Sequence, residues 1–144
     1  METLTFSTNI NAPKEKVWEI LWSNDTYGKW TNVFAEGSIA VTDWKEGSKV
    51  LFLSGCDGMV SKIAANKPYE FMSIAHQGIV KDGIEDTTSE AVQGWKGAME
   101  NYTLTEADGQ TSLQVDMDTV EEYKGYFKEK WPLAIEQIKL LSEG

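Results

Sequence analysis

The first thirty residues change from a strand-like pattern of apolar positions to a helical one. Leu4, Phe6 and Ile10 alternate with polar residues, as in a half-buried strand. Pro13 suits the first position of a helix, where its missing N–H costs nothing. The apolar residues of segment 14–22 cover more than one helical face. We therefore predict one strand, then a short helix packed on two sides, and then a second helical turn over residues 26–30.

The middle of the chain predicts short strands joined by tight turns. Segments 39–41, 50–53 and 59–64 contain the apolar and β-branched residues that favour strands. Between them, Trp44-Lys45-Glu46-Gly47 and Gly55-Cys56-Asp57-Gly58 are typical turn sequences. The last two segments are therefore expected to form an antiparallel hairpin.

Two further hairpins can be given a register. A two-residue turn at Asp108-Gly109 places residues whose numbers sum to 217 opposite one another: Leu104 with Leu113, Tyr102 with Val115, and Glu100 with Met117. A hairpin centred near Thr88 would pair numbers that sum to 176: Met72 with Leu104, Ile74 with Tyr102, and His76 with Glu100. Both registers select the same inward face, which supports them because a slip of one residue would reverse every side chain. The polar segment 81–94 is then a long loop, which we expect to act as a mobile flap.

After Val120 the apolar period lengthens to about 3.6 residues, which predicts a helix. One stripe recurs at steps of four and three: Tyr123, Phe127, Trp131, Ala134, Ile138 and Leu141. This is the longest predicted helix. The predicted order is a strand, short helices, about six antiparallel strands and a long C-terminal helix, which is an α+β protein.

Composition places this pattern in one small domain. The chain has 144 residues, of which 41% are hydrophobic, so we expect a single domain over 1–144 with one core. Its beginning lacks both a basic start and an apolar run, and we expect a cytoplasmic protein. Cys56 and His76 are the only cysteine and histidine, which excludes an intramolecular disulfide and a zinc site built from several such residues. We expect no metal site and no cofactor.

The charge excludes two classes of partner. There are 13 basic residues, all lysine, against 23 acidic ones, which gives a formal net charge of −10. Nucleic acids and anionic membranes are bound by positive patches, and phosphates commonly by arginine. We therefore expect neither nucleic-acid binding nor membrane insertion.

Several motifs, in this order, resemble one superfamily. They are Asn11-Ala12-Pro13-Lys14-Glu15-Lys16-Val17-Trp18, Gly28-Lys29-Trp30, Trp44-Lys45-Glu46-Gly47-Ser48-Lys49-Val50, Gly109-Gln110-Thr111-Ser112-Leu113 and Lys130-Trp131-Pro132-Leu133-Ala134-Ile135. The chain is similar over its whole length to START-like helix-grip (SRPBCC) proteins, and most of all to bacterial homologues of the activator of the heat-shock-protein-90 ATPase. The resemblance implies a curved six- or seven-stranded antiparallel sheet around the C-terminal helix, with two short helices after the first strand and an apolar cavity. It leaves function open, because one fold can carry many functions.

His76 and Glu100 are the candidate chemical pair. Both fall at inward positions among apolar residues, where a carboxylate needs a proton, a hydrogen bond or a cation. One interpretation is a structural pair that closes one end of the sheet, and the other is a polar anchor in a ligand pocket. If the protein catalyses a reaction, His76 is the acid or base and Glu100 orients it.

Three functions remain open at this stage. We favour the binding of a small hydrophobic molecule, such as a lipid, a polyketide or an aromatic metabolite, without catalysis. The alternatives are a cyclase-like or hydrolase-like enzyme and a co-chaperone-like module that binds a protein partner. The candidate ligand-binding residues are Trp44, Ile74, His76, Trp95, Glu100, Tyr102, Val115, Met117, Phe127 and Trp131.

Overall fold

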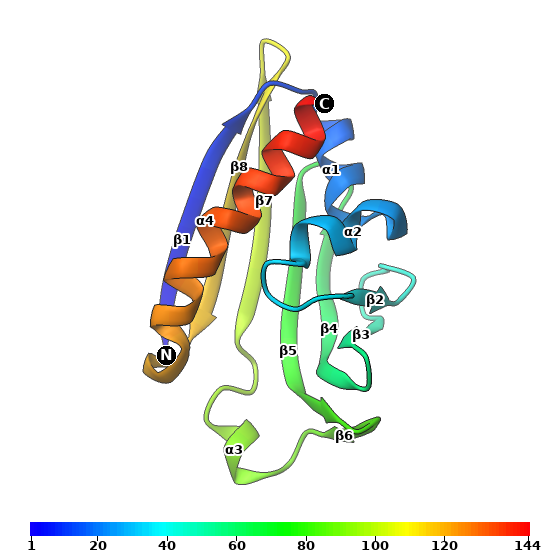
Figure 1. The fold of residues 1–144 in the computed structure, drawn as a ribbon, viewed down its shortest axis with the longest axis vertical. Helices are drawn as coiled ribbons and strands as arrows, with labels where there is room; N and C mark the ends of the chain where they lie inside the picture. Colours follow the sequence, from blue (N-terminus) through cyan, green and yellow to red (C-terminus); the bar gives the residue numbers. More distant parts are fainter.

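The computed structural model describes residues 1–144 and shows a curved antiparallel sheet with helices on its concave side (Figure 1). The strands are β1 (Glu2–Ile10), β2 (Ile39–Val41), β3 (Lys49–Ser54), β4 (Asp57–Lys67), β5 (Phe71–Lys81), β6 (Ile84–Asp86), β7 (Met99–Ala107) and β8 (Gln110–Thr119). The helices are α1 (Lys14–Trp22), α2 (Asn24–Thr31), α3 (Glu90–Gln93) and α4 (Glu121–Glu143). This arrangement confirms the helix-grip fold expected from the resemblance.

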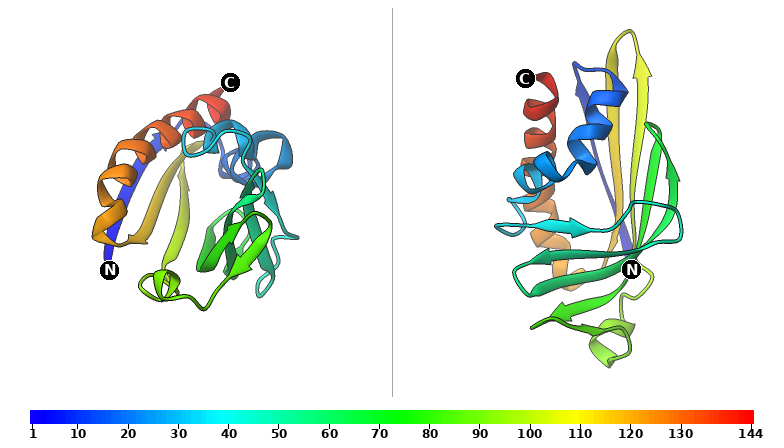
Figure 2. Two further views of the ribbon diagram at one scale, coloured as in Figure 1. Left: turned by 60° about the horizontal axis from the view of Figure 1, so that its bottom comes forward. Right: turned by 90° about the vertical axis from the view of Figure 1, so that its right-hand side faces the viewer.

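Seven strands form a continuous path in the order β1-β8-β7-β5-β4-β3-β2, and β6 pairs with β5 beside this path. The first strand therefore lies against the last one, with Glu2 opposite Thr119 and Ile10 opposite Thr111. Helix α4 crosses the open side of the sheet and packs against β1, α1 and α2 (Figure 2). None of the helices is long and apolar enough to cross a membrane.

The register predicted from the Asp108-Gly109 turn is confirmed. Leu104 pairs with Leu113, Tyr102 with Val115, and Glu100 with Met117. Asp108 and Gly109 have φ angles of 54° and 78°, as a type I′ turn requires. Because a two-residue turn allows only one alignment of the two strands that it joins, it fixes every pair along the hairpin.

The second predicted register is wrong by two residues. Met72 lies opposite Tyr102, and Ile74 opposite Glu100, so His76 is not the direct partner of Glu100. The error arises because segment 81–94 is not the plain loop that we expected. It contains β6, which turns back onto β5, and the short helix α3, so the hairpin has no centre at Thr88. An offset of two residues preserves the face on which each side chain lies.

Glycine at position 78 lets β6 return closely onto β5. A Cβ atom on Gly78 would lie 2.1 Å from the carbonyl oxygen of Asp86, closer than two such atoms can approach. The absence of a side chain is therefore required for the 84–86 strand to pair where it does. Through this contact, β6 and α3 close the lower end of the sheet (Figure 1).

Candidate functional site

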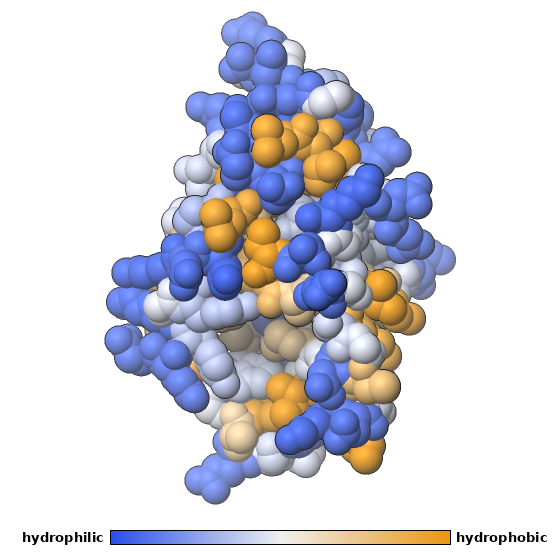
Figure 3. Space-filling view, viewed as in Figure 1, coloured by the Kyte–Doolittle hydropathy of each residue, from blue (hydrophilic) through white to orange (hydrophobic).

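A cavity of about 550 Å³ lies between the concave face of the sheet and helices α2 and α4. This volume is within the range of about 300–1,000 Å³ in which small-molecule sites usually fall. Of its 29 lining residues, 20 are hydrophobic. In the space-filling view, the surface is hollowed in the lower half of the face shown (Figure 3). Aromatic side chains dominate the wall: Tyr27, Trp30, Phe34, Phe52, Trp95, Tyr102, Tyr123, Tyr126, Phe127 and Trp131.

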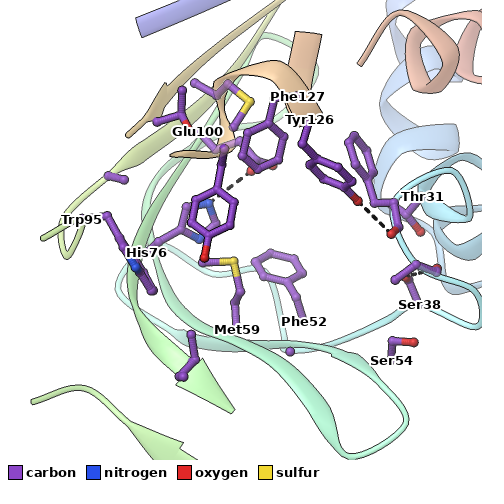
Figure 4. Close-up of a pocket in the computed structure, with 18 of the residues that line it drawn as sticks. Thr31, Ser38, Phe52, Ser54, Met59, His76, Trp95, Glu100, Tyr126 and Phe127 are labelled. Carbon is purple, nitrogen blue, oxygen red and sulfur yellow. Dashed lines mark hydrogen bonds and ion pairs between the residues drawn. The ribbon is translucent and has the colours of Figure 1, made fainter. Parts of the chain in front are cut away.

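One side of the cavity is closed by a contact between α4 and the segment after α2. The Tyr126 hydroxyl donates a hydrogen bond of 2.9 Å to the backbone oxygen of Phe34. Figure 4 shows Tyr126 reaching toward the side where Thr31 and Ser38 lie, while His76 and Trp95 lie on the opposite side. Tyr126 is 40% exposed, so this hydrogen bond is at the surface of the protein. It links α4 to the segment after α2 at the rim of the cavity.

A chain of hydrogen bonds runs through His76 on the sheet side of the cavity. The Nε2 atom of His76 lies 3.1 Å from Oε1 of Glu100, and the hydroxyl of Tyr102 donates to Oε2 of the same carboxylate. On the other side of the ring, Nδ1 lies 2.7 Å from the Ser61 hydroxyl. Because an ionised carboxylate only accepts, Nε2 carries a proton; in the neutral ring, Nδ1 then accepts from Ser61. Both ring nitrogens are therefore occupied by the protein.

Irregular pairing of β5 on both sides positions this ring. The backbone N–H of His76 donates to the oxygen of Ala98, and the N–H of Gly97 donates to the oxygen of His76. With Gly97 at a φ of 90°, these two bonds have the pattern of a G1 bulge. On the β4 side, Ser61 pairs with His76 while Val60 pairs with Gly78, which leaves Gln77 without a partner. Such bulges redirect side chains, and here they bring Ser61 to the His76 ring.

The surroundings of Glu100 favour its ionised form. Burial raises the pKa of the carboxyl, but the hydrogen bond and electrostatic interaction with His76, together with the Tyr102 hydroxyl, outweigh burial and lower the pKa below its ordinary value. Burial and the nearby carboxylate raise the pKa of Tyr102, so the hydroxyl stays protonated and able to donate. The Glu100 side chain is 19% exposed, and it lines the cavity. An ionised carboxylate therefore faces a mainly hydrophobic cavity.

Seven of the ten residues predicted to bind a ligand lie on the cavity wall: His76, Trp95, Glu100, Tyr102, Met117, Phe127 and Trp131. Trp44, Ile74 and Val115 do not lie on that wall. Ile74 and Val115 have no exposed surface, because that part of the sheet is filled by the core. Trp44 is partly buried against the core, with its ring centroid 4.8 Å from that of Trp22.

Comparison with known proteins identifies the family. The sequence profile of the family described as activator of Hsp90 ATPase homolog 1-like protein matches residues 11–143. The chain belongs to this family. No curated protein is similar to it in sequence.

Solved structures share the fold at low sequence identity. The solution structure of the Aha1 dimer from Colwellia psychrerythraea superposes with a TM-score of 0.76 at 17% identity, covering 99% of this chain and 97% of that one. CalU16 from Micromonospora echinospora gives 0.69 at 14% identity, covering 99% and 76%. DynU16, from the dynemicin biosynthetic locus, gives 0.72 at 14% identity, covering 97% of this chain and 46% of that one. At such identities the likeness shows the fold alone.

Several residues of the site were not predicted from the sequence. Ser61 was not found because the irregular pairing at Gln77, which turns Ser61 toward His76, leaves no mark in the apolar alternation. Tyr27, Phe34 and Phe52 line the cavity from α2, from the segment after it and from β3. None of the three was among the residues predicted to bind a ligand. No group of three or more histidine, cysteine, aspartate or glutamate side chains is placed to hold a metal ion.

Proposed function

We propose that this protein binds a small hydrophobic molecule, such as a lipid, a polyketide or an aromatic metabolite, in the cavity between the sheet and α4, without catalysis. The observation that carries the proposal is an aromatic cavity of about 550 Å³ with the hydrogen-bonded carboxylate of Glu100 on its wall. Binding sites for small molecules usually combine many apolar contacts with a few polar groups that fix orientation. The presence of the similar DynU16 in a biosynthetic locus agrees with a metabolite as ligand.

The hydrogen bonds of His76 argue for binding over the cyclase-like or hydrolase-like alternative. A general base must reach the proton that it removes, either directly or through one water. In His76, one ring nitrogen lies against Glu100 and the other against Ser61. Ser61 itself is 1% exposed and does not line the cavity, so it is no candidate nucleophile for a ligand held there. His76 and Glu100 thus act as a fixed polar anchor.

The co-chaperone alternative rests on the description of the family alone. That description names an activator of the Hsp90 ATPase, which would act through a protein surface. Such a role leaves the cavity without a use, which is why we place it after ligand binding.

A substitution that fills the cavity tests the proposal. Ala35 lines the cavity and is only half-buried, so Ala35→Trp adds an indole at the wall with limited strain on the core. Ala107→Trp is the matched control, because Ala107 is exposed at the end of β7 and does not line the cavity. The probe is N-phenyl-1-naphthylamine, an uncharged fluorophore.

We expect saturable binding of one probe per chain, weakened at least about tenfold by Ala35→Trp and unchanged by Ala107→Trp, because only the first indole occupies the ligand volume. Native mass spectrometry of freshly purified protein would in addition reveal a co-purified molecule. Equal probe binding by the two variants would contradict the proposal.

A further inference from the structure

The cavity wall carries a one-sided set of ionisable groups. Its carboxylates are Asp57 and Glu100, its only imidazole is His76, and it contains no lysine. Asp118 also borders the cavity, but its carboxylate lies on the other face of β8, where it accepts a hydrogen bond from Thr3. Two carboxylates against one imidazole leave the wall negative whether or not the ring is charged. The surrounding protein has the same sign, with a net charge of −10. A ligand with a carboxylate or phosphate head group would meet repulsion here and no cation other than His76.

Glu100 retains capacity to accept hydrogen bonds from a ligand. Each of its oxygens holds one donor, Nε2 of His76 on Oε1 and the Tyr102 hydroxyl on Oε2. A carboxylate offers about four lone-pair positions, so two remain. The side chain is part of the cavity wall, and Figure 4 shows it on the same side as His76, with Phe127 beside it. A donor in the cavity can therefore reach a carboxylate whose position is already fixed.

The aromatic side chains around this carboxylate add a second attraction for positive charge. The face of a tryptophan, tyrosine or phenylalanine ring is electronegative and attracts a cation within about 6 Å of the ring centre. Ten such residues line the cavity, among them Phe127, Trp95 and Tyr102. The combination of aromatic faces with an ionised carboxylate is chemically suited to an ammonium group attached to an apolar body.

We propose that the ligand is a hydrophobic amine, bound as the ammonium ion with its charged group on Glu100 and its apolar body against the aromatic wall. This inference rests on the proposed binding function and adds the class of ligand. The ammonium donates to the two lone pairs of Glu100 that are still free. His76 and Tyr102 keep their hydrogen bonds to the carboxylate, so no existing hydrogen bond has to break.

The test compares three probes that share one ring system: 2-naphthylmethylamine, 2-naphthylmethanol and 2-naphthylacetic acid. At pH 7 they are a cation, a neutral alcohol and an anion, and their dissociation constants are measured by isothermal titration calorimetry. We expect the amine to bind about tenfold more tightly than the alcohol and about a hundredfold more tightly than the acid. The wild-type protein alone gives this comparison, so the test does not depend on any variant folding.

Glu100→Gln then locates the effect. This change removes the charge while keeping the size of the side chain, and it should remove the advantage of the amine over the alcohol. Glu136→Gln is the control, because Glu136 is exposed on α4 and outside the cavity, yet its replacement changes the net charge equally.

The outcomes separate the two proposals. Binding of the amine no tighter than that of the alcohol or the acid would overturn the amine while leaving hydrophobic binding in place. Loss of the preference in Glu136→Gln as much as in Glu100→Gln would also overturn it, because the effect would then come from net charge. Failure of all three probes to bind, together with failure of the uncharged fluorophore, would contradict the binding function itself.

Discussion

Glu100 both lines the cavity and contributes to the hydrogen bonding between strands of the sheet. Its carboxylate belongs to β7, yet the donors that hold it come from His76 on β5 and from Tyr102, two positions along its own strand. A charge taken out of water is costly unless donors replace the lost solvent. The stability of the protein should therefore respond when one of these donors is removed.

Tyr102→Phe isolates one donor, because it keeps the ring and removes only the hydroxyl. The free energy of unfolding at pH 7 should fall by about 1.5–3 kcal/mol, the usual range for a hydrogen bond to a charged group. The hydroxyl lowers the pKa of Glu100, so its contribution is present above the pKa of the unfolded carboxyl and disappears as the pH falls through the folded pKa. The measurement is denaturant unfolding of both proteins between pH 7 and pH 3.

The difference between wild type and Tyr102→Phe should shrink over the acidic end of that range. Tyr123→Phe serves as the control, since Tyr123 also lines the cavity but is 46% exposed and makes no side-chain hydrogen bond. A loss of stability that is the same at pH 3 as at pH 7 would show that the hydroxyl does not act through the charge of Glu100.

The contact between His76 and Glu100 could be predicted from sequence although the register was wrong. Side chains two residues apart on a strand point to the same face, so the offset of two moved His76 along the face and not across it. The long side chain of Glu100 spans the remaining diagonal. Ser61 could not be predicted, since it depends on one unpaired residue, Gln77, in the neighbouring strand.

At the scale of elements, Trp131 connects α4 with the rest of the protein. Its indole is 2% exposed and contacts aromatic rings from several elements: Phe6 on β1, Trp30 on α2, Phe34 after α2, and Tyr102 on β7. The centroid distances lie between 5.0 Å for Phe34 and 6.2 Å for Trp30. Trp131 thus packs α4 against the sheet and against α2.

Trp131→Ala should lower the free energy of unfolding by about 3–5 kcal/mol, the usual cost of removing a large buried aromatic side chain. Leu133→Ala, two residues further along the same helix, should cost no more than about 0.5 kcal/mol because Leu133 is 51% exposed. Thermal and denaturant unfolding of the two variants provide the comparison. Similar losses for both would mean that α4 is not docked through Trp131.

The elements with strong local signals were predictable, and those that depend on distant contacts were not. Helix α4 carries a long apolar stripe, and the β7–β8 hairpin contains an Asp-Gly turn that sets its own register. Strand β6 has only three residues, and its Ile84 is 72% exposed. Its pairing depends on the lack of a side chain at Gly78, which no local pattern could indicate.

For the molecule as a whole, α4 is both the cover of the sheet and one wall of the cavity. Its residues Tyr123, Tyr126, Phe127 and Trp131 line the cavity, while Ala134 and Ile138 are buried in the core. Its last turn is joined to the start of the chain, because Lys139 donates to the oxygen of Asn9 and Glu143 accepts from the N–H of Asn11. A sheet left with an exposed apolar face is not independently stable.

A chain that ends at residue 120 should therefore fail to fold cooperatively. The apolar concave face would lose its long cover, and the aromatic residues that contact Trp131 would be left in water. Circular dichroism melting of the truncated chain beside the full one gives the measurement. A soluble product with a sharp thermal transition would show that the sheet and the two short helices form a folding unit without α4.

The class of the fold was readable from the order of strand and helix patterns, whereas the cavity was expected only from the family resemblance. Whether a helix at this position fills the concave face or leaves space depends on how far it stands from the sheet. Here the packing of α4 includes ring contacts of Trp131 with Phe6 and Tyr102, which are distant from it in sequence. A pattern of apolar residues looks the same in both cases, which explains why Ile74 and Val115 were assigned to a cavity that they do not reach.

The pairing of β1 with β8 also sets the order of events during synthesis of the chain. Thr3 contacts Asp118, 115 residues later, so β1 cannot find its partner until β8 has left the ribosome. Contacts so distant in sequence slow folding, because the entropy of closing the chain must be lost before the contact stabilises anything. The β3–β4 and β7–β8 hairpins, by contrast, can form locally as they emerge. The apolar face of β1 therefore stays exposed for most of translation, and this interval is when the nascent protein is most open to aggregation or to capture by a chaperone.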